Sequence, residues 1–251
     1  MAARKAPSLR RRSKQRPMLE SDYIRQRIED VRERITRACG RAGRSPNEVC
    51  LVVVTKTHPV QVVLNTLAAG ASDLGENRIQ EALPKIEAVR AAGTPCRFHL
   101  IGHLQSNKSK LAVRNFDLIH SVDSVDLARA LDRHAAEAGK VQPILLQVNV
   151  SGEQSKSGLN PETAAPALKQ ILDECPALRV DGLMTMAPLV EDPETTRPVF
   201  RALRQLRDNL REQAACGLGL ELSTGMSNDY EIAVEEGATL VRVGSAILGS
   251  R

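Results

Sequence analysis

Aromatic residues are scarce in this sequence. It contains two Tyr, three Phe and no Trp among 251 residues. Proteins that bind single-stranded nucleic acid stack the bases on aromatic rings, and this chain has too few rings to build such a platform. The composition therefore argues against base recognition by stacking.

Cysteine pairs and long apolar runs are also lacking. The five cysteines are scattered, with no Cys-x-x-Cys spacing, which argues against a disulfide framework and against a zinc site. His99 and His103 share one face of a predicted strand, but no third ligand is placed beside them, so we expect packing or hydrogen bonding for His99 and no metal. No apolar run approaches the ~20 residues of a membrane span. We expect a soluble, cytoplasmic protein with no membrane partner.

The net charge of +5 is concentrated at the N-terminus. Seven Arg and Lys residues precede the first acid, Glu20, so the rest of the chain carries 28 basic and 30 acidic residues. A short basic run is typical of a solvated tail. We predict a disordered basic arm over residues 1–18, one folded domain over 19–251, and no nucleic-acid partner; nucleic-acid binding through this arm is the weaker alternative.

Short apolar runs alternate with helical patterns along the rest of the chain. Predicted strands cover residues 49–54, 71–74, 97–101, 118–121, 142–150, 178–184, 220–223 and 240–243. Predicted helices cover 60–69, 78–91, 108–114, 125–138, 161–174, 194–215 and 230–236. Eight strands alternating with helices favour a single (β/α)8 barrel of the TIM type. An open doubly wound sheet is disfavoured because no Gly-x-Gly-x-x-Gly follows the first strand.

Almost nothing follows the last predicted strand, so the barrel lacks its final helix. Residues 19–43 place Ile24, Ile28, Val31 and Ile35 at helical spacing. We expect this amphipathic helix to occupy the position that the missing helix leaves open.

Polar residues follow most of the predicted strands, at the barrel face where active sites lie. Lys56 comes directly after the run 52–55, and an apolar surrounding there would desolvate its ammonium, as Schiff-base chemistry requires. Residues 223–228 form a hydroxyl-rich turn, and residues 242–246 offer an Arg, a Gly and a Ser. Because both segments follow the last two strands, they predict a phosphate site.

These residues resemble the pyridoxal phosphate homeostasis proteins, whose barrel is similar to the N-terminal domain of alanine racemase. The resemblance runs from about residue 20 to the end, and the combination of motifs is highly specific. The matching segments are 53–57, 75–77 with 80–81, 99–108, 156–158, 182–186, 222–229 and 241–245.

The resemblance implies a barrel of pyridoxal phosphate fold type III, without the extra β domain of alanine racemase, and Lys56 as the lysine that binds pyridoxal 5′-phosphate (PLP) as a Schiff base. It places Arg242 near the pyridine nitrogen. It further implies that the phosphate is held by Ser223, Gly225, Ser227, Gly244 and Ser245, and that the ring pocket is lined by Asn77, His103 and Asn149.

The same resemblance suggests a carrier of the cofactor more than an enzyme. A racemase needs two bases, and the racemases with this barrel take a tyrosine from the β domain that this chain lacks. Only Tyr23 and Tyr230 are present, and Arg242 would not protonate the pyridine nitrogen. We expect a monomeric, non-catalytic protein of PLP homeostasis, with PLP-dependent apo-enzymes as partners; a racemase acting on small amino acids is the alternative.

Overall fold

The computed structural model describes residues 20–153, 157–213 and 218–249. The predicted basic arm lies outside this range, so its disorder stays a prediction. Within the described residues no helix is long and apolar enough to cross a membrane.

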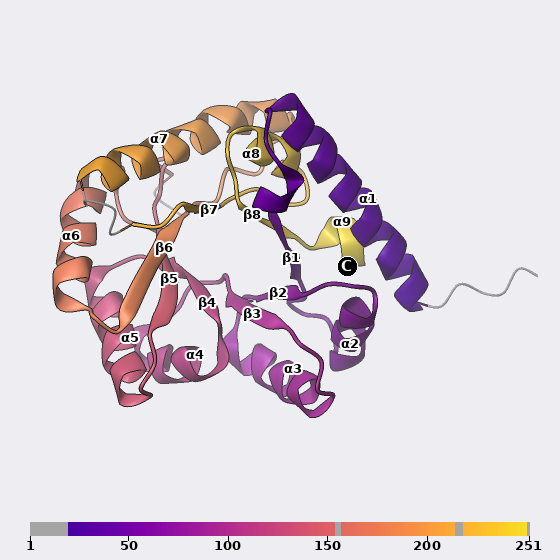
Figure 1. Cartoon of the computed structure of the whole chain (residues 1–251), viewed down its shortest axis with the longest axis horizontal. Coiled ribbons are helices and arrows are strands. Elements are labelled where there is room, and N and C mark those ends of the chain that lie inside the picture. The colour runs from indigo at the N-terminus through magenta and orange to yellow at the C-terminus, as the bar shows by residue number, and fades with distance from the viewer. Residues whose placement is uncertain (1–19, 154–156, 214–217, 250–251) are drawn as a thin grey trace, which may run out of the picture.

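The strands form a closed parallel barrel in sequence order, surrounded by helices (Figure 1). This confirms the predicted fold. The strands are β1 Cys50–Val54, β2 Asp73–Glu76, β3 Arg97–Leu100, β4 Leu118–Val122, β5 Gln142–Gln147, β6 Leu178–Met184, β7 Glu221–Ser223 and β8 Leu240–Val243. The helices are α1 Glu20–Arg41, α2 Val60–Ala68, α3 Ile79–Ala91, α4 Ser109–Asn115, α5 Val125–Glu137, α6 Ala164–Glu174, α7 Arg197–Gln213, α8 Tyr230–Glu235 and α9 Ser245–Leu248.

The barrel closes between its first and last strands. Val52 pairs with Arg242 and Val53 with Val243 across β1 and β8. A small cluster of buried side chains, separate from the larger core under the helices, comes from five strands and fills the barrel. Its members are Val52, Leu118, Leu145, Met184 and Leu240. The strands are thus packed on both faces, which is why their sequences are nearly continuous apolar runs.

Helix α1 takes the place of the missing last helix, as the sequence predicted. It lies between α8 and α2 and covers the four-residue α9 (Figure 1). Ile24, Ile28, Val31 and Ile35 are all buried, because their spacing places them on one face of the helix.

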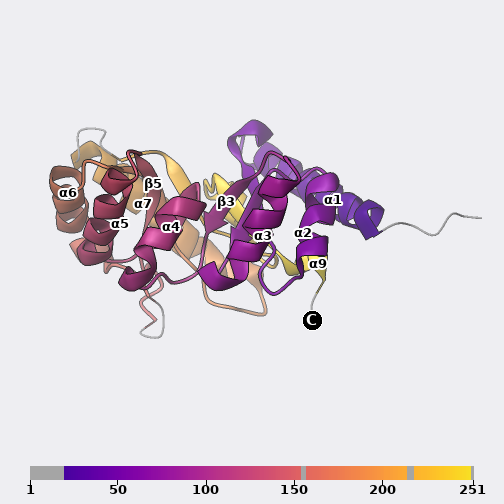
Figure 2. The ribbon, with the colours of Figure 1, turned by 90° about the horizontal axis from the view of Figure 1, so that it is seen from below.

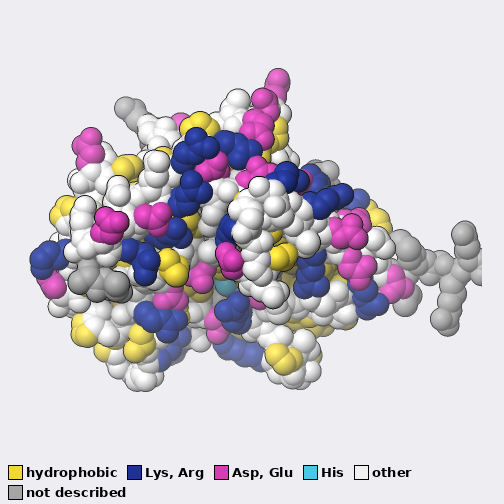
Figure 3. All heavy atoms as spheres, turned by 45° about the horizontal axis from the view of Figure 1, so that its top comes forward, with side chains coloured by type: hydrophobic (Ala, Val, Ile, Leu, Met, Phe, Trp, Pro, Cys, Tyr) yellow, Lys and Arg dark blue, Asp and Glu magenta, His cyan; other side chains and the backbone are white. Residues whose placement is uncertain are grey.

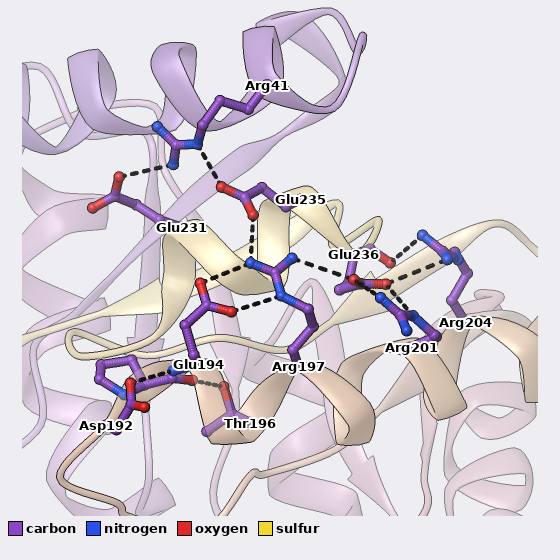
Figure 4. A network of polar contacts seen from close by, with 11 residues as sticks. Arg41, Asp192, Glu194, Thr196, Arg197, Arg201, Arg204, Glu231, Glu235 and Glu236 are labelled. Carbon is purple, nitrogen blue, oxygen red and sulfur yellow. Dashed lines mark hydrogen bonds and ion pairs between the residues drawn. The ribbon is translucent and has the colours of Figure 1, made fainter.

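Ion pairs join the outer surfaces of three helices at this closure (Figure 4). Arg41 of α1 binds Glu231 and Glu235 of α8. Arg197 of α7 binds Glu235 from the other side. Figure 3 shows Lys and Arg side chains interspersed with Asp and Glu on the face that α1 and α7 cover. These charges remain partly exposed to solvent, Arg41 by half of its side chain, so they set the docking of α1 less than its apolar stripe does.

Two predicted elements are shorter than their apolar patterns, one at its end and the other at its start. The predicted strand 142–150 stops at Gln147, because the chain leaves the β-sheet and Val148 makes only an isolated bridge with Leu159. The predicted helix 194–215 begins as a 3-10 turn, Pro193–Thr196, capped by the Asp192 side chain. The loops after β5 and β6 project from the same side of the barrel (Figure 2).

Candidate functional site

A cavity of about 440 Å³ opens at the carboxyl ends of the strands. Seven residues that the sequence analysis assigned to the cofactor line it together. They are Lys56, Asn77, His103, Ser227, Arg242, Gly244 and Ser245. Residues that end or follow β1, β2, β3, β7 and β8 therefore meet at one place, as expected for the carboxyl-terminal face of a barrel.

Three further predicted site residues lie outside the cavity lining. Ser223 is fully buried and its hydroxyl bonds to Arg242. Gly225 is buried in the turn after β7 at φ +87°, where a Cβ would lie 2.6 Å from Ala233. The Asn149 amide donates to the carbonyl oxygen of Glu153. Their contacts with the cofactor stay predictions.

Lys56 lies in a turn just past the end of β1, and its side chain is exposed. The neighbouring Thr57 has φ +65°, a left-handed conformation that is unusual for a β-branched residue. This exposure differs from the apolar surrounding that the sequence predicted for Lys56. Strand β1 is buried up to Thr55, and the chain turns outward only at Lys56, which places the amine at the cavity mouth.

A buried ion pair lies directly beneath this turn. The Lys85 ammonium of α3 binds the Glu76 carboxylate of β2 at 2.8 Å, and both side chains are almost fully buried. Lys85 also donates to the Thr55 carbonyl oxygen, and the Thr55 hydroxyl donates to Glu76. Glu81 accepts the backbone N–H of Thr57. The residues on both sides of Lys56 are thus fixed by one charged cluster.

Burial and charge pairing have opposite effects on the pKa of Glu76 in this cluster. Burial raises the pKa of Glu76 above its usual range, while Lys85 and Thr55 act in the opposite direction. The second oxygen of Glu76 has no hydrogen-bond partner among the described residues. Sequence reasoning did not single out Lys85, although its position in the apolar stripe of α3, between Ala82 and Val89, was an available signal.

Arg242 is the second buried charge at the cavity. Only 4% of the residue is exposed. Its guanidinium donates to the Ser223 hydroxyl at 2.5 Å and to the Thr185 carbonyl oxygen at 3.0 Å. Burial lowers the pKa of Arg242 to about 10, and Asp229 raises it in part. Among the described residues no carboxylate forms an ion pair with it, so a cation faces the cavity without a directly bound counter-charge.

The backbone beside Arg242 is arranged to receive an anion. The Ser227 hydroxyl accepts the N–H groups of Gly244 and Ala246 at 3.3 Å each, which are long for hydrogen bonds. A Cβ at position 244 would lie 3.3 Å from Val54, so glycine lets β8 and β1 approach closely. A hydroxyl, two N–H groups and a nearby cation suit a phosphate group.

The remaining walls of the cavity are of two kinds. Met186, Pro188, Leu189 and Val190 form an apolar wall from the loop after β6. On the β3 side, the His103 ring lies 3.3 Å from the Asp123 carboxylate, and His103 is more than half exposed. An apolar wall opposite polar groups suits a flat, partly apolar ligand. No cluster of three potential metal ligands exists among the residues that the structure covers.

The loop 154–158 after β5, which includes the family-like segment 156–158, falls partly outside the described residues. Ser157 is described and belongs to the cavity lining, whereas residues 154–156 are not. The Gln147 amide of β5 donates to the Ser157 carbonyl oxygen at 2.7 Å and also lines the cavity. Gln147 is a lining residue that sequence reasoning missed, because it lies within an otherwise apolar strand.

Comparison with known families places the chain clearly. The family model of the alanine racemase N-terminal domain matches residues 27–251. The pyridoxal phosphate homeostasis protein of Aquifex aeolicus (strain VF5) is 43% identical over 226 residues, which cover 90% of this chain and 97% of that protein. The Escherichia coli (strain K12) protein of the same name is 37% identical, with 91% and 97% covered.

Solved structures agree with these sequence relatives. PipY of Synechococcus elongatus PCC7942, with PLP bound, is 37% identical, covers 90% of this chain and all of its own, and has a TM-score of 0.79. The alanine racemase of Clostridium difficile 630 has a TM-score of 0.70 at 13% identity, and 60% of that chain is covered. The second likeness concerns the fold alone.

Proposed function

The chain belongs to the pyridoxal phosphate homeostasis protein family, and we propose that it binds PLP covalently through Lys56 and buffers or delivers it inside the cell. One observation carries the proposal. The Lys56 amine and the buried Arg242 guanidinium line the same cavity, beside the N–H groups of Gly244 and Ala246. PLP requires an amine for its aldehyde and cationic or N–H donors for its phosphate and ring nitrogen.

The residues present fit the cofactor at both ends. Ser227, Gly244 and Ser245 would hold the phosphate, because they surround the N–H groups described above. Asn77 and His103 would flank the ring, and Arg242 would face its nitrogen. Three residues would support the lining without forming part of it, because each contacts a neighbouring residue. They are Ser223, which bonds to Arg242, Gly225, which packs against Ala233, and Asn149, which bonds to Glu153.

Covalent attachment is a condensation. The neutral Lys56 amine adds to the aldehyde carbon, a C=N bond replaces the C=O bond, and the oxygen leaves as water. The protein keeps Lys56 near its attack position through the cluster of Lys85, Glu76 and Glu81. When bound, the cofactor supplies an electron sink, and a guanidinium in place of an acid at its ring nitrogen weakens that sink.

A carrier function is supported by the absence of a tyrosine from the lining of the described cavity. Tyr23 is on the outer face of α1 and Tyr230 is buried in the core. The second base that racemases with this barrel use has no tyrosine here to provide it. We extend the proposal to a monomer that supplies PLP-dependent apo-enzymes in the cytoplasm. Four described cysteines are free thiols, consistent with a reducing compartment.

The test is an absorption spectrum of the purified protein with PLP, before and after borohydride reduction, followed by mass mapping. We expect a Schiff-base band that reduces onto Lys56 and is lost in Lys56→Ala. Lys110→Ala, which removes an exposed lysine outside the lining, is the control and keeps the band. Incubation with L-alanine should give no D-alanine; racemisation would make the protein an enzyme, and a band that survives in Lys56→Ala would refute the lysine assignment.

A further inference from the structure

A chain of hydrogen bonds runs through the barrel from the cofactor cavity to its opposite end. Arg242 donates to the Ser223 hydroxyl, which lies 2.8 Å from Nδ1 of His120. Nε2 of His120 lies 2.9 Å from Nδ1 of His99. Nε2 of His99 lies 2.9 Å from the Asp73 carboxylate. We call these five residues the relay.

The relay runs from the carboxyl-terminal end of the barrel to its amino-terminal end. Arg242 is on β8 and lines the cavity, whereas Asp73 is the first residue of β2, at the opposite end of the strands. All five residues are at most 5% exposed. Asp73 is also bound by Arg97, whose side chain is largely exposed. The relay therefore connects a buried cation to a carboxylate near the far surface.

The chemistry of the ends fixes the direction of every link. Hydrogen bonding to His99 and Ser72 lowers the pKa of Asp73 to about 2 against the effect of burial, so it is an acceptor only. Nε2 of His99 then carries a proton and its Nδ1 accepts from Nε2 of His120. Burial keeps the pKa of His120 well below its usual range, and the Arg242 guanidinium acts in the same direction, so His120 is neutral.

The Ser223 hydroxyl completes this order. A neutral His120 that donates through Nε2 must accept at Nδ1, and among the described residues the Ser223 hydroxyl is the group placed there to donate. The Ser223 oxygen in turn accepts from Arg242. Each residue from Arg242 to His99 donates one hydrogen bond to the next residue toward Asp73. Every contact in the relay therefore pairs a donor with an acceptor. The opposite tautomer of His120 would leave the Ser223 proton without an acceptor in a buried site.

We propose that His120 and His99 are positioning residues that hold the Arg242 guanidinium in one orientation toward the cofactor, through a relay of neutral groups that ends on Asp73. A carboxylate bound directly to Arg242 would neutralise its charge at the cavity. The relay instead holds the counter-charge at a distance and leaves the donors of Arg242 that face the cavity for the ligand. The role toward PLP rests on the proposed function, whereas the direction of the relay does not.

The first test is ¹⁵N NMR of the histidine rings in ligand-free, full-length protein at neutral pH. We expect His99 and His120 both as neutral Nε2–H tautomers. Observation of His120 as the Nδ1–H tautomer, or of either ring as an imidazolium, would overturn the relay. Because no PLP is present, this result does not depend on the proposed function.

A pair of variants at His99 separates positioning from packing. The amide of Asn reaches the place of Nδ1, so His99→Asn keeps an acceptor for His120. The amide of Gln reaches the place of Nε2, so His99→Gln keeps the contact with Asp73 and leaves Nε2–H of His120 without an acceptor. We expect His120 to stay Nε2–H in His99→Asn and to gain Nδ1–H character in His99→Gln.

The affinity for PLP should follow the same order. We expect about tenfold weaker binding in His99→Gln and a change of less than about threefold in His99→Asn. Ser109→Ala removes another buried serine hydroxyl, bound to the Ser106 carbonyl oxygen outside the cavity lining and the relay, and should leave the affinity unchanged. Equal losses of PLP affinity in both His99 variants would show that His99 acts only by packing. No PLP binding by the wild-type protein would instead refute the proposed function, with the tautomers still deciding the relay.

Discussion

The cavity has a buried cation on each side, and the two are neutralised in different ways. Beneath Lys56, the Lys85 ammonium touches the Glu76 carboxylate at 2.8 Å. On the other side, the hydrogen bonds that Arg242 donates within the described residues go to a hydroxyl and a carbonyl oxygen, and three residues of the relay separate it from the Asp73 carboxylate. Lys85 does not line the cavity, whereas Arg242 does.

Because of this difference, we expect the Lys85 pair to matter mainly for the stability of the fold and Arg242 mainly for binding of the cofactor. A directly paired buried charge is costly to break, because the remaining partner is left buried and unpaired. A cation held by neutral dipoles keeps its electrostatic effect on a ligand. The Lys85 side therefore shapes the turn that presents Lys56, and the Arg242 side presents charge to the cofactor.

The largest expected effect is at the direct pair. Lys85→Met leaves the Glu76 carboxylate without its counter-charge, and we expect the free energy of unfolding to fall by about 3–5 kcal/mol. Urea denaturation followed by circular dichroism measures it. The double variant Lys85→Met/Glu76→Gln should recover much of the loss; a double variant as unstable as Lys85→Met would show that the cluster acts by shape and not by charge.

The contrasting variant on the other side is Arg242→Met. We expect PLP to bind about tenfold to a hundredfold more weakly, because hydrogen bonds to a charged group are lost. The free energy of unfolding should fall less than in Lys85→Met, since no carboxylate loses its direct partner. Arg211→Met, which removes a guanidinium bound to the Leu218 carbonyl oxygen, is the matched control for titrations of PLP followed by absorbance. An unchanged affinity for PLP in Arg242→Met would show that Arg242 does not act on the cofactor, and the contrast with Lys85 would be wrong.

The two carboxylates should give opposite dependence on pH. The pKa of Asp73 is lowered from 3.8 to about 2, so its contribution to stability is present above pH 3.8 and is lost as the pH falls toward 2. This amounts to about 2 kcal/mol. The pKa of Glu76 is raised, so its ionisation weakens the fold as the pH rises above the usual value for glutamate.

Urea unfolding across this pH range, in wild type and in Asp73→Asn, measures the first of these effects. The variant should lose less stability than the wild type between pH 3.8 and 2. Parallel curves for the two proteins would mean that Asp73 does not bear the depressed pKa.

The smallest loss of unfolding free energy is expected at a partly exposed ion pair. Arg41 binds Glu231 and Glu235 on the surface shown in Figure 4, and half of its side chain is exposed. We expect Arg41→Gln to cost less than about 1 kcal/mol of unfolding free energy, and less at high salt. A cost near that of Lys85→Met would show that the charges dock α1 more strongly than its apolar stripe does.

Much of the fold followed from the sequence because its signals are local. The β-branched run 49–54 and the apolar spacing in 19–43 each depend on near neighbours in the chain, and both elements formed as expected. Pro193 and the cap at Asp192 moved the start of α7 to Arg197, a shift that the apolar pattern alone does not contain.

The candidate site was predicted less completely. Lys56, Arg242 and Ser227 were found because each follows or ends a strand on the barrel's carboxyl-terminal face. Gln147 and His120 lie within strands, where the sequence resembles any buried segment. For His99 the sequence predicted packing or hydrogen bonding; the structure shows hydrogen bonds, with partners from β2 and β4.

The sequence by itself determined the alternation of strands and helices, the amphipathic first helix and the polar residues that end the strands, because each depends on residues close together in the chain. Only the tertiary structure decided which buried charges meet. Glu76 binds Lys85 through the packing of α3 on β2, while Arg242 is joined to Asp73 by three residues that come from β7, β4 and β3 of the closed barrel. Burial makes such partners obligatory, since an unpaired charge is costly there, but the identity of each partner depends on barrel closure and strand register.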